Sequence, residues 1–203
     1  MSDERSKIPG DRQEEKRAVL MDPFDKPALE IVRFSMYRDM DVFPPDVSLP
    51  FGYRAEPWVG PLIPAFAASM AVAFADSSEL ETYPRLSSRE GCQRIVEDIC
   101  NMPDFLSGAT WLVFFNREPC GFILCGQAKK SEIAQIRIFG VAPRHRRFHI
   151  GSWLVNRALW AFHDRKFPQA MLNVNRTNHA GVRFLRSLGF YVAQSREYLL
   201  NIE

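Results

Sequence analysis

Hydrophobic positions along this chain recur with both helical and alternating spacing, which predicts a mixture of helices and strands. Helices are predicted at 61–74, 87–102, 151–165 and 178–188, and strands at 53–58, 111–116, 121–126, 133–141 and 170–174. The segments 191–195 and 198–202 predict a closing hairpin. The apolar segment 28–40 fits either a strand or a short helix.

Capping and turn residues mark several of these boundaries. Ser87 and Glu90 fit a capping box at the start of the second helix. Asn178 and Gly189 are placed to cap the two ends of the last helix. An Arg-Glu-Pro turn at 117–119 is expected to join two of the strands, and residues 128–131 are expected to form the next turn.

The order of these elements predicts the fold class. It runs strand, two helices, three antiparallel strands, helix, strand, helix and final strands, without an internal repeat. This order indicates an α/β or mixed α+β fold with one central mixed sheet. The charge-dense segment 1–26 is expected to be a disordered tail, because it cannot bury enough apolar surface to offset its ordering entropy. Residues 27–52 form an extension with a Pro-rich linker, and 53–203 form the main domain.

Composition narrows the class of protein. The chain has 203 residues, of which 46% are hydrophobic, and this content supports a hydrophobic core. The net charge of +2 gives no indication of nucleic-acid binding. Four cysteines lack the spacing of a metal site, so we expect reduced thiols and no metal. No signal peptide is visible, and the most apolar window, 65–75, is about half a membrane span. We therefore expect a soluble cytoplasmic protein without a membrane partner.

The candidate chemistry begins at 141–154, with the sequence VAPRHRRFHIGSWL. This segment follows a predicted strand and opens a predicted helix, so backbone N–H groups converge at a helix N-terminus. Such a site binds phosphate, because these N–H groups lack partners and the helix dipole adds positive potential. Arg144, Arg146 and Arg147 add further positive charge.

Two motifs in this order resemble the GNAT (GCN5-related N-acetyltransferase) superfamily. The acetyl-CoA motif of that family is matched by Val141, Pro143, Arg146, Gly151 and Leu154, with His149 at a position where the family has glycine. A second family motif is matched by Asn178, Gly181, Leu185, Gly189 and Phe190. The stretch 28–58 also looks like the inter-domain segment of mycothiol-synthase-like members.

The resemblance implies a central, mostly antiparallel mixed sheet with helices on both faces, and acetyl-CoA as cosubstrate. It implies that the pyrophosphate lies on the N–H groups of Arg147, Phe148, His149, Ile150, Gly151 and Ser152, beside Arg146. Phe139, Gly140 and Val141 would pair with the pantetheine arm, and Asn178 would contact it. The Val141 N–H would polarise the thioester carbonyl as an oxyanion-type donor.

The chain departs from the family pattern at His149 and at the proton-transfer positions. A Cβ at His149 is tolerable if that residue already has helical φ and ψ. Leu185 occupies the position of the usual tyrosine general acid, and Gln135 and Asn173 occupy positions where a glutamate base is common. None of the three ionises, so we expect a low-pKa amine substrate, or help from Glu132, Tyr191 or Tyr198 through water.

Three features of the sequence concern recognition of the acceptor substrate. Gln135 and Arg137 share strand parity with Phe139 and Val141, so we expect them to face the cofactor cleft. The segment 76–85 would form an acceptor wall, whose acidic residues either attract a cationic amine or are simply exposed. The leading expectation is acetyl transfer to an amine of a small molecule. A CoA-binding sensor, a protein N-terminal acetyltransferase and a homodimer are left open.

Overall fold

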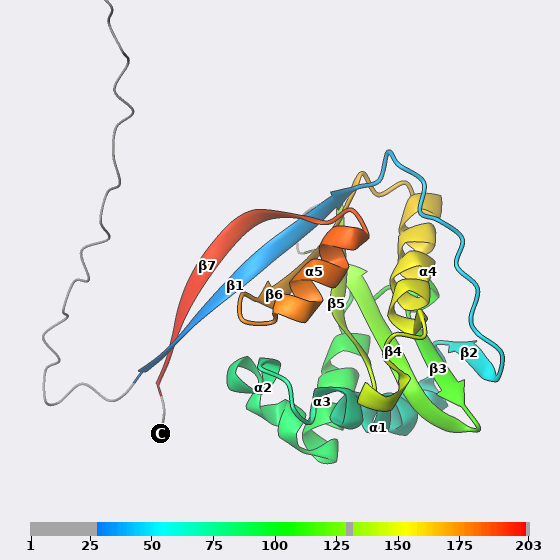
Figure 1. Cartoon of the computed structure of the whole chain (residues 1–203), viewed down its shortest axis with the longest axis horizontal. Coiled ribbons are helices and arrows are strands. Elements are labelled where there is room, and N and C mark those ends of the chain that lie inside the picture. Colours follow the sequence, from blue (N-terminus) through cyan, green and yellow to red (C-terminus); the bar gives the residue numbers. More distant parts are fainter. Residues whose placement is uncertain (1–27, 129–131, 202–203) are drawn as a thin grey trace, which may run out of the picture.

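One seven-stranded sheet organises the computed structural model, which describes residues 28–128 and 132–201. The strands are β1 (Ala28–Asp39), β2 (Tyr53–Pro57), β3 (Trp111–Phe115), β4 (Glu118–Gln127), β5 (Ile133–Val141), β6 (Gln169–Asn175) and β7 (Tyr191–Asn201). Their order is β2-β3-β4-β5-β6-β1-β7 (Figure 1). Among these pairs only β5 and β6 run parallel, which confirms the predicted mixed, mostly antiparallel sheet.

Helices cover both faces of this sheet. The α-helices are α1 (Ile63–Phe74), α2 (Glu79–Thr82), α3 (Arg89–Cys100), α4 (Ile150–Asp164) and α5 (His179–Ser187), with 3-10 turns at Gly60–Leu62, Pro84–Ser87, Ser107–Ala109 and Pro143–His145. On one face α1 and α3 pack against Leu112, Phe122 and Leu124. On the other face α4 and α5 share a core with Ile136 and Leu172. The described helices are all too short or too polar to cross a bilayer.

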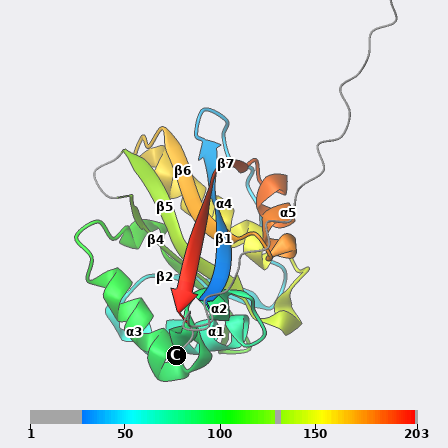
Figure 2. The same ribbon diagram turned by 90° about the vertical axis from the view of Figure 1, so that its left-hand side faces the viewer.

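The N-terminal segment left undecided by the sequence is a strand inside the sheet. β1 lies between β6 and β7, and its first residues pair with β7 alone, before the register with β6 begins at Arg33. The two strands therefore form a ribbon that extends past the rest of the sheet, and both lie at the front in Figure 2. The predicted closing hairpin is wrong, because 191–201 forms the single strand β7, which β1 pairs along its whole length.

Two boundary predictions are wrong by a residue or two. Ser88, and not Ser87, caps α3, since its side chain accepts a hydrogen bond from the Gly91 N–H. The turn between β3 and β4 is Asn116-Arg117, both with positive φ, which is the backbone that a two-residue hairpin requires. The disordered tail predicted at 1–26 and most of the turn predicted at 128–131 lie outside the described residues.

The other helix caps follow the sequence. Asn178 accepts a hydrogen bond from the Gly181 N–H at 2.9 Å, and Gly189 has φ +85° just beyond α5. Glycine is favoured at that position because an L side chain is strained there. Both caps fix α5 directly after the carboxyl end of β6.

The parallel pair β5–β6 positions the site. Its register covers only Ile133–Gln135 against Gln169–Met171. Beyond these residues β5 stays with β4 and β6 stays with β1, so a gap opens toward the carboxyl ends of both strands. In open α/β sheets, ligands bind outside such carboxyl ends, where neighbouring connections diverge.

Candidate functional site

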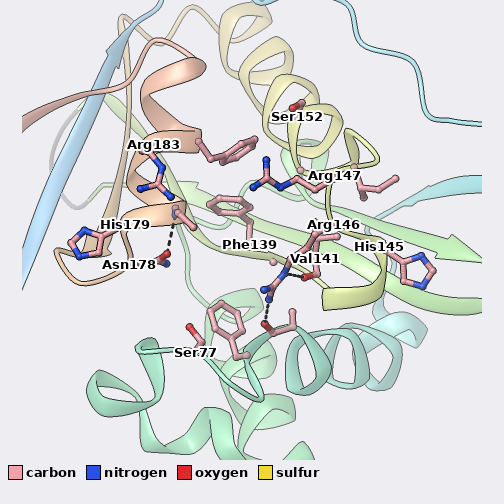
Figure 3. A pocket seen from close by; sticks show the side chains of 18 of the residues that line it. Ser77, Phe139, Val141, His145, Arg146, Arg147, Ser152, Asn178, His179 and Arg183 are labelled. Atoms are coloured by element: carbon pink, nitrogen blue, oxygen red, sulfur yellow. Dashed lines mark hydrogen bonds between the residues drawn. The ribbon is translucent and has the colours of Figure 1, made fainter.

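A cleft of about 1160 Å³ lies at this gap. Its volume exceeds the 300–1,000 Å³ of most small-ligand pockets, so it suits a large ligand. Its walls come from the end of α1 with the loop that follows, from the last residues of β5, from the loop into α4, and from the start of α5 (Figure 3). Segments from four parts of the chain thus meet at the place that the two sequence motifs predict.

The loop from β5 into α4 contains two strained residues. Arg147 has φ 68° and His149 has φ 59°, so both occupy the left-handed region that favours glycine. The condition under which a side chain at His149 would be tolerated without strain, helical φ and ψ, is therefore not met, and the backbone there has the conformation that glycine adopts easily. A side chain there costs about 1–2 kcal/mol, and strain of this kind gathers at ligand sites.

The N-terminus of α4 is open to the cleft. His149 is the N-cap residue, and its side chain makes no capping hydrogen bond. The first intrahelical bond runs from the Trp153 N–H to the His149 carbonyl, so the N–H groups from His149 to Ser152 have no helical partner. His149, Ile150, Gly151 and Ser152 all line the cleft, which makes this end of the helix an anion site.

The end of β5 adds two more backbone donors. The Ala142 N–H donates to the Cys120 carbonyl, so Val141 belongs to a non-hydrogen-bonded pair with Gly121. The N–H groups of Val141 and Phe139 consequently point away from β4, toward the gap. Gly140 also lines the cleft, but its polar backbone groups face β4.

The Arg146 side chain joins the loop into α4 to the end of α1, along one wall of the cleft. Its Nε donates to the Val141 carbonyl at 3.1 Å, and its Nη2 donates to the Ala73 carbonyl in the last turn of α1 at 3.1 Å. These two bonds tie the loop into α4 to the end of α1, and Arg146 also lines the cleft. Arg147 and Arg183 extend from opposite sides toward Phe139, and Asp76 is the carboxylate in this lining (Figure 3).

Replacing Arg146 with methionine is expected to weaken acetyl-CoA binding about tenfold and to lower stability by about 1 kcal/mol. Two charge-assisted bonds between the loop and α1 would be lost. For a chain of this size the melting temperature should fall by about 2–4 °C. Arg147→Met serves as the matched control, since it removes a nearby cation that makes no such bonds. Its loss of acetyl-CoA affinity should shrink as the salt concentration rises, while its melting temperature stays unchanged. Equal melting temperatures for both variants would contradict the role of Arg146 in holding the loop to α1.

The remaining predicted cofactor residues are placed differently. Phe148 is 51% exposed, lies near Tyr53 and does not line the cleft. Asn178 lines the cleft while its Oδ1 caps α5. Glu132 is exposed and precedes β5, seven residues before Phe139, the first cleft residue of that strand, which is about 23 Å at about 3.3 Å per residue. The structure therefore does not bring Glu132 to this site.

The parity argument for Gln135 and Arg137 is wrong. Between Leu124 and Cys125 of β4 the partner on β5 changes from Ile138 to Ile136, so Arg137 sits in a β-bulge. The bulge reverses the alternation and turns Gln135 and Arg137 to the face opposite Phe139 and Val141. Arg137 forms an ion pair with Asp104 at 2.7 Å, and neither residue lines the cleft.

Ionisable groups are missing where the resemblance would place them. Leu185 is 1% exposed in the core beneath α5. Asn173 accepts a hydrogen bond from the Ser35 hydroxyl. The four cysteines are free and lie outside the cleft lining. Burial raises the pKa of the Cys120 thiol to about 11 and that of Cys100 to about 12, so these thiols stay protonated near neutral pH.

The acidic segment 76–85 is not simply an exposed loop. Glu79 is only 7% exposed and accepts a hydrogen bond from the Asn175 N–H, whereas Asp76 is exposed at the cleft. Thr177, His179 and Arg183 also line the cleft, although no sequence motif indicates them. Thr177 and His179 follow the carboxyl end of β6 within four residues, and Arg183 lies one turn further along α5, so the rule for ligand sites in parallel sheets could have indicated them.

Solved structures share this fold at low sequence identity. A GCN5-related N-acetyltransferase from Sphaerobacter thermophilus aligns with TM-score 0.65 and 19% identity over 85% of this chain and 51% of that chain. The ribosomal-protein-S18-alanine N-acetyltransferase from Escherichia coli aligns with TM-score 0.55 and 16% identity over 74% and 94%. PaiA N-acetyltransferase from Thermoplasma acidophilum, in complex with coenzyme A, aligns with the same score and identity over 74% and 99%.

The chain thus spans about half the length of the Sphaerobacter relative. No curated protein matches its sequence. The sequence model of the Acetyltransferase (GNAT) family matches residues 75–190, which is more than half of the chain. The match includes the loop into α4, the gap between β5 and β6, and α5. On this match and this fold, the chain belongs to the GNAT acetyltransferase family.

Proposed function

We propose that this chain transfers an acetyl group from acetyl-CoA to an amine of a small molecule by direct attack. One observation carries the proposal. The uncapped N-terminus of α4 and the free N–H groups of Phe139 and Val141 meet in one cleft, at the carboxyl ends of a parallel strand pair. Phosphate binding and thioester polarisation both require donors of this kind.

The residues of the cleft fit the parts of acetyl-CoA. N–H groups from Arg147 to Ser152 would hold the pyrophosphate, with Arg147 and Arg183 adding positive potential. The pantetheine arm would lie along Phe139 and Val141 as an added strand, near Asn178. The complex of the Thermoplasma relative with coenzyme A supports coenzyme A as the class of ligand.

The Val141 N–H is the proposed donor to the thioester carbonyl. The Phe139 N–H faces the same gap about 7 Å away along β5, nearer the point where β5 and β6 meet, and would donate to the pantetheine arm instead. Attack forms the N–C bond and a tetrahedral intermediate, and its collapse breaks the C–S bond. The amine proton leaves to solvent, and the thiolate takes a proton. A donor of this type is worth a few kcal/mol in the transition state.

Direct attack requires no enzyme nucleophile, which agrees with the raised pKa of the buried thiols. The attacking nitrogen must be neutral, and Leu185, Gln135 and Asn173 cannot accept its proton. Proximity and backbone donors would then supply most of the rate acceleration.

Two specific observations favour other functions. The Escherichia coli relative is named for acetylation of an alanine of ribosomal protein S18, which favours a protein α-amine as a second acceptor class. The non-ionisable residues Leu185, Gln135 and Asn173 favour a CoA-binding sensor with weakened catalysis.

Ligand-induced stabilisation and free-thiol release test the proposal together. Acetyl-CoA at 100 times its Kd should stabilise the full chain by about 2.7 kcal/mol. A panel of small amines and of peptides with free N-termini should then show acceptor-dependent thiol release. Stabilisation without release would favour the sensor, release with peptides alone would favour the protein acetyltransferase, and no stabilisation would contradict all three.

A further inference from the structure

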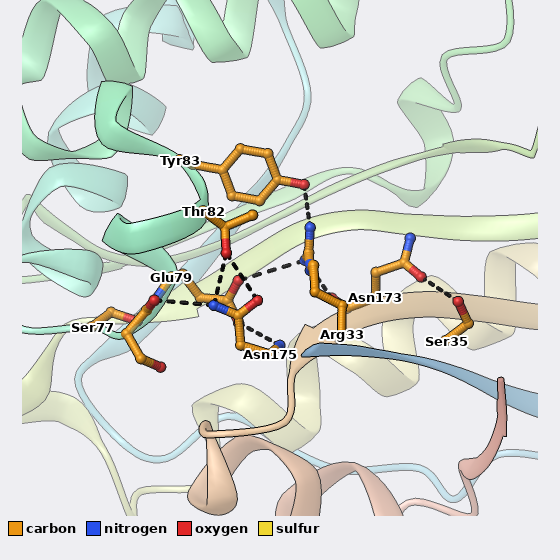
Figure 4. A network of polar contacts seen from close by, with 9 residues as sticks. Arg33, Ser35, Ser77, Glu79, Thr82, Tyr83, Asn173 and Asn175 are labelled. Atoms are coloured by element: carbon orange, nitrogen blue, oxygen red, sulfur yellow. Dashed lines mark hydrogen bonds and ion pairs between the residues drawn. The ribbon is translucent and has the colours of Figure 1, made fainter. Parts of the chain in front are cut away.

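A polar network with a buried centre joins the two walls of the cleft on the side opposite Arg146. It consists of Arg33, Glu79, Thr82, Tyr83 and Asn175, here called the Glu79 network (Figure 4). Arg33 comes from β1, Asn175 ends β6, and the other three belong to α2 and the turn that follows it. Strand β1 lies outside the segment matched by the family.

Glu79 is the centre of this network. Its Oε1 accepts the Asn175 N–H at 3.0 Å, and its Oε2 lies 3.5 Å from Nη2 of Arg33. The two charged side chains are only 9% and 11% exposed. A buried carboxylate is costly unless a cation and hydrogen bonds compensate it. Arg33 supplies that cation, and it also donates to the Tyr83 hydroxyl and the Asn173 carbonyl.

Asn175 connects the network to the cleft wall. Its amide donates to the Ser78 carbonyl at 3.0 Å and to the Thr82 hydroxyl at 2.9 Å. The Glu79 N–H donates to the Ser77 hydroxyl. Ser77 and Ser78 line the cleft on one side, and Thr177 and Asn178, directly after β6, line it on the other. The Glu79 network therefore fixes the distance between these two walls.

We propose that Arg33 is a positioning residue for acetyl-CoA. By neutralising Glu79 it holds the segment from Ser77 to Thr82 against the end of β6, and so it sets the width of the cofactor cleft. The inference rests on the proposed function, and it assigns a role at the site to β1. Arg33 itself acts through Glu79 and Asn175, because it does not line the cleft.

A charge cycle in the full chain tests this role. CoA affinity is measured by calorimetry at a temperature where circular dichroism shows each variant folded. Arg33→Met should weaken CoA binding at least tenfold, because it leaves Glu79 buried without its cation. Arg33→Met/Glu79→Gln should stay within fivefold of the unmodified protein, since glutamine keeps the bond from the Asn175 N–H without a charge. Arg33→Lys should stay within threefold.

The matched control is Arg85→Met. Arg85 pairs with Asp98 at 2.7 Å, but both side chains are more than half exposed, so CoA affinity should change less than twofold. In thiol-release assays with any acceptor found active, Arg33→Met should raise the KM for acetyl-CoA and leave kcat within twofold. If Arg33 only stabilised the fold, Arg33→Met would reduce the fraction of enzyme molecules that are folded and active. The apparent kcat would then fall while the KM for acetyl-CoA stayed unchanged.

Three results would overturn the proposal: unchanged CoA affinity in folded Arg33→Met, a double variant as weak as the single one, or a loss confined to kcat. If Arg33→Met does not fold, Glu79→Ala replaces it, because this change removes the acceptor of the Asn175 N–H. CoA binding should then weaken at least tenfold, and unchanged affinity would overturn the proposal. Failure of the unmodified protein to bind CoA would instead contradict the proposed function.

Discussion

Replacing Ser152 with aspartate is expected to weaken acetyl-CoA binding about 100-fold while leaving the fold at least as stable. Ser152 is the third residue of α4 and lines the cleft at the open end of that helix. Side chains there tilt toward the helix N-terminus, so the carboxylate would lie beside the proposed pyrophosphate. Two charges about 5 Å apart at an effective dielectric of 20 repel by about 3 kcal/mol, which is about 100-fold in affinity.

The stability of the same variant separates charge from misfolding. An acidic residue in the first turn of a helix is stabilising by about 0.3–1 kcal/mol, so the melting temperature should stay constant or rise. Ser152→Asn has nearly the same shape without the charge and should bind acetyl-CoA within threefold of the unmodified protein. Calorimetric titration measures all three proteins. Unchanged affinity in Ser152→Asp would show that the pyrophosphate does not bind at this helix end.

An acceptor with an α-amino group is expected to react about 200-fold faster at pH 7 than one with a lysine-type amine. The attacking nitrogen must be neutral, and the positions of Leu185, Gln135 and Asn173 provide no base. An α-amine with a pKa of about 8 is about 10% neutral at pH 7, whereas a lysine amine with a pKa of about 10.4 is about 0.04% neutral. The ratio of kcat/KM at pH 7 should follow these two fractions.

The pH profile gives the direction of this effect. Below the pKa of the amine, its neutral fraction rises about tenfold per pH unit, so kcat/KM should rise with pH up to about 8 for the α-amine and up to about 10 for the lysine-type amine. The raised pKa values of Cys100 and Cys120, about 12 and 11, keep these thiols from titrating in this range. A pair such as glycinamide and Nα-acetyl-lysine amide provides the comparison. Equal profiles for both amines would indicate an enzyme base.

The part of the fold that the sequence predicts well is the part specified by local patterns. The period-3.6 spacing of Cys92, Val96 and Ile99 predicts α3, and all three are buried. The cap residues Asn178 and Gly189 locate both ends of α5 within one residue. The loop from Val141 to Ser152 is placed correctly because strand, turn and helix follow each other directly in the chain.

The features that the sequence does not predict depend on distant partners. β1 pairs with β6 and β7, 130 or more residues further along the chain, and neither pairing leaves a local pattern in 28–39. The charge of Arg33 looks like that of any surface residue until β1 brings it to Glu79. For the same reason Glu79, which belongs to an acidic segment that could have been exposed, is instead buried beside Arg33.

Three features of the site that the sequence does not predict have identifiable physical causes. A single bulge at Arg137 reverses strand parity and removes Gln135 and Arg137 from the cleft face. His149 is held in the left-handed region by the turn into α4, which residue propensity does not predict. Arg146 satisfies two protein carbonyls, so its charge serves the cleft wall before any ligand binds.

A crystal structure of the full chain with CoA tests the central claim most directly. The account predicts pyrophosphate oxygens within about 2.7–3.2 Å of backbone N–H groups between Arg147 and Ser152, and the pantetheine arm beside Phe139 and Val141. It also predicts that Arg146 keeps its bonds to the Val141 and Ala73 carbonyls. CoA bound elsewhere on the protein, or bound with the N-terminus of α4 left unpaired, would contradict the account.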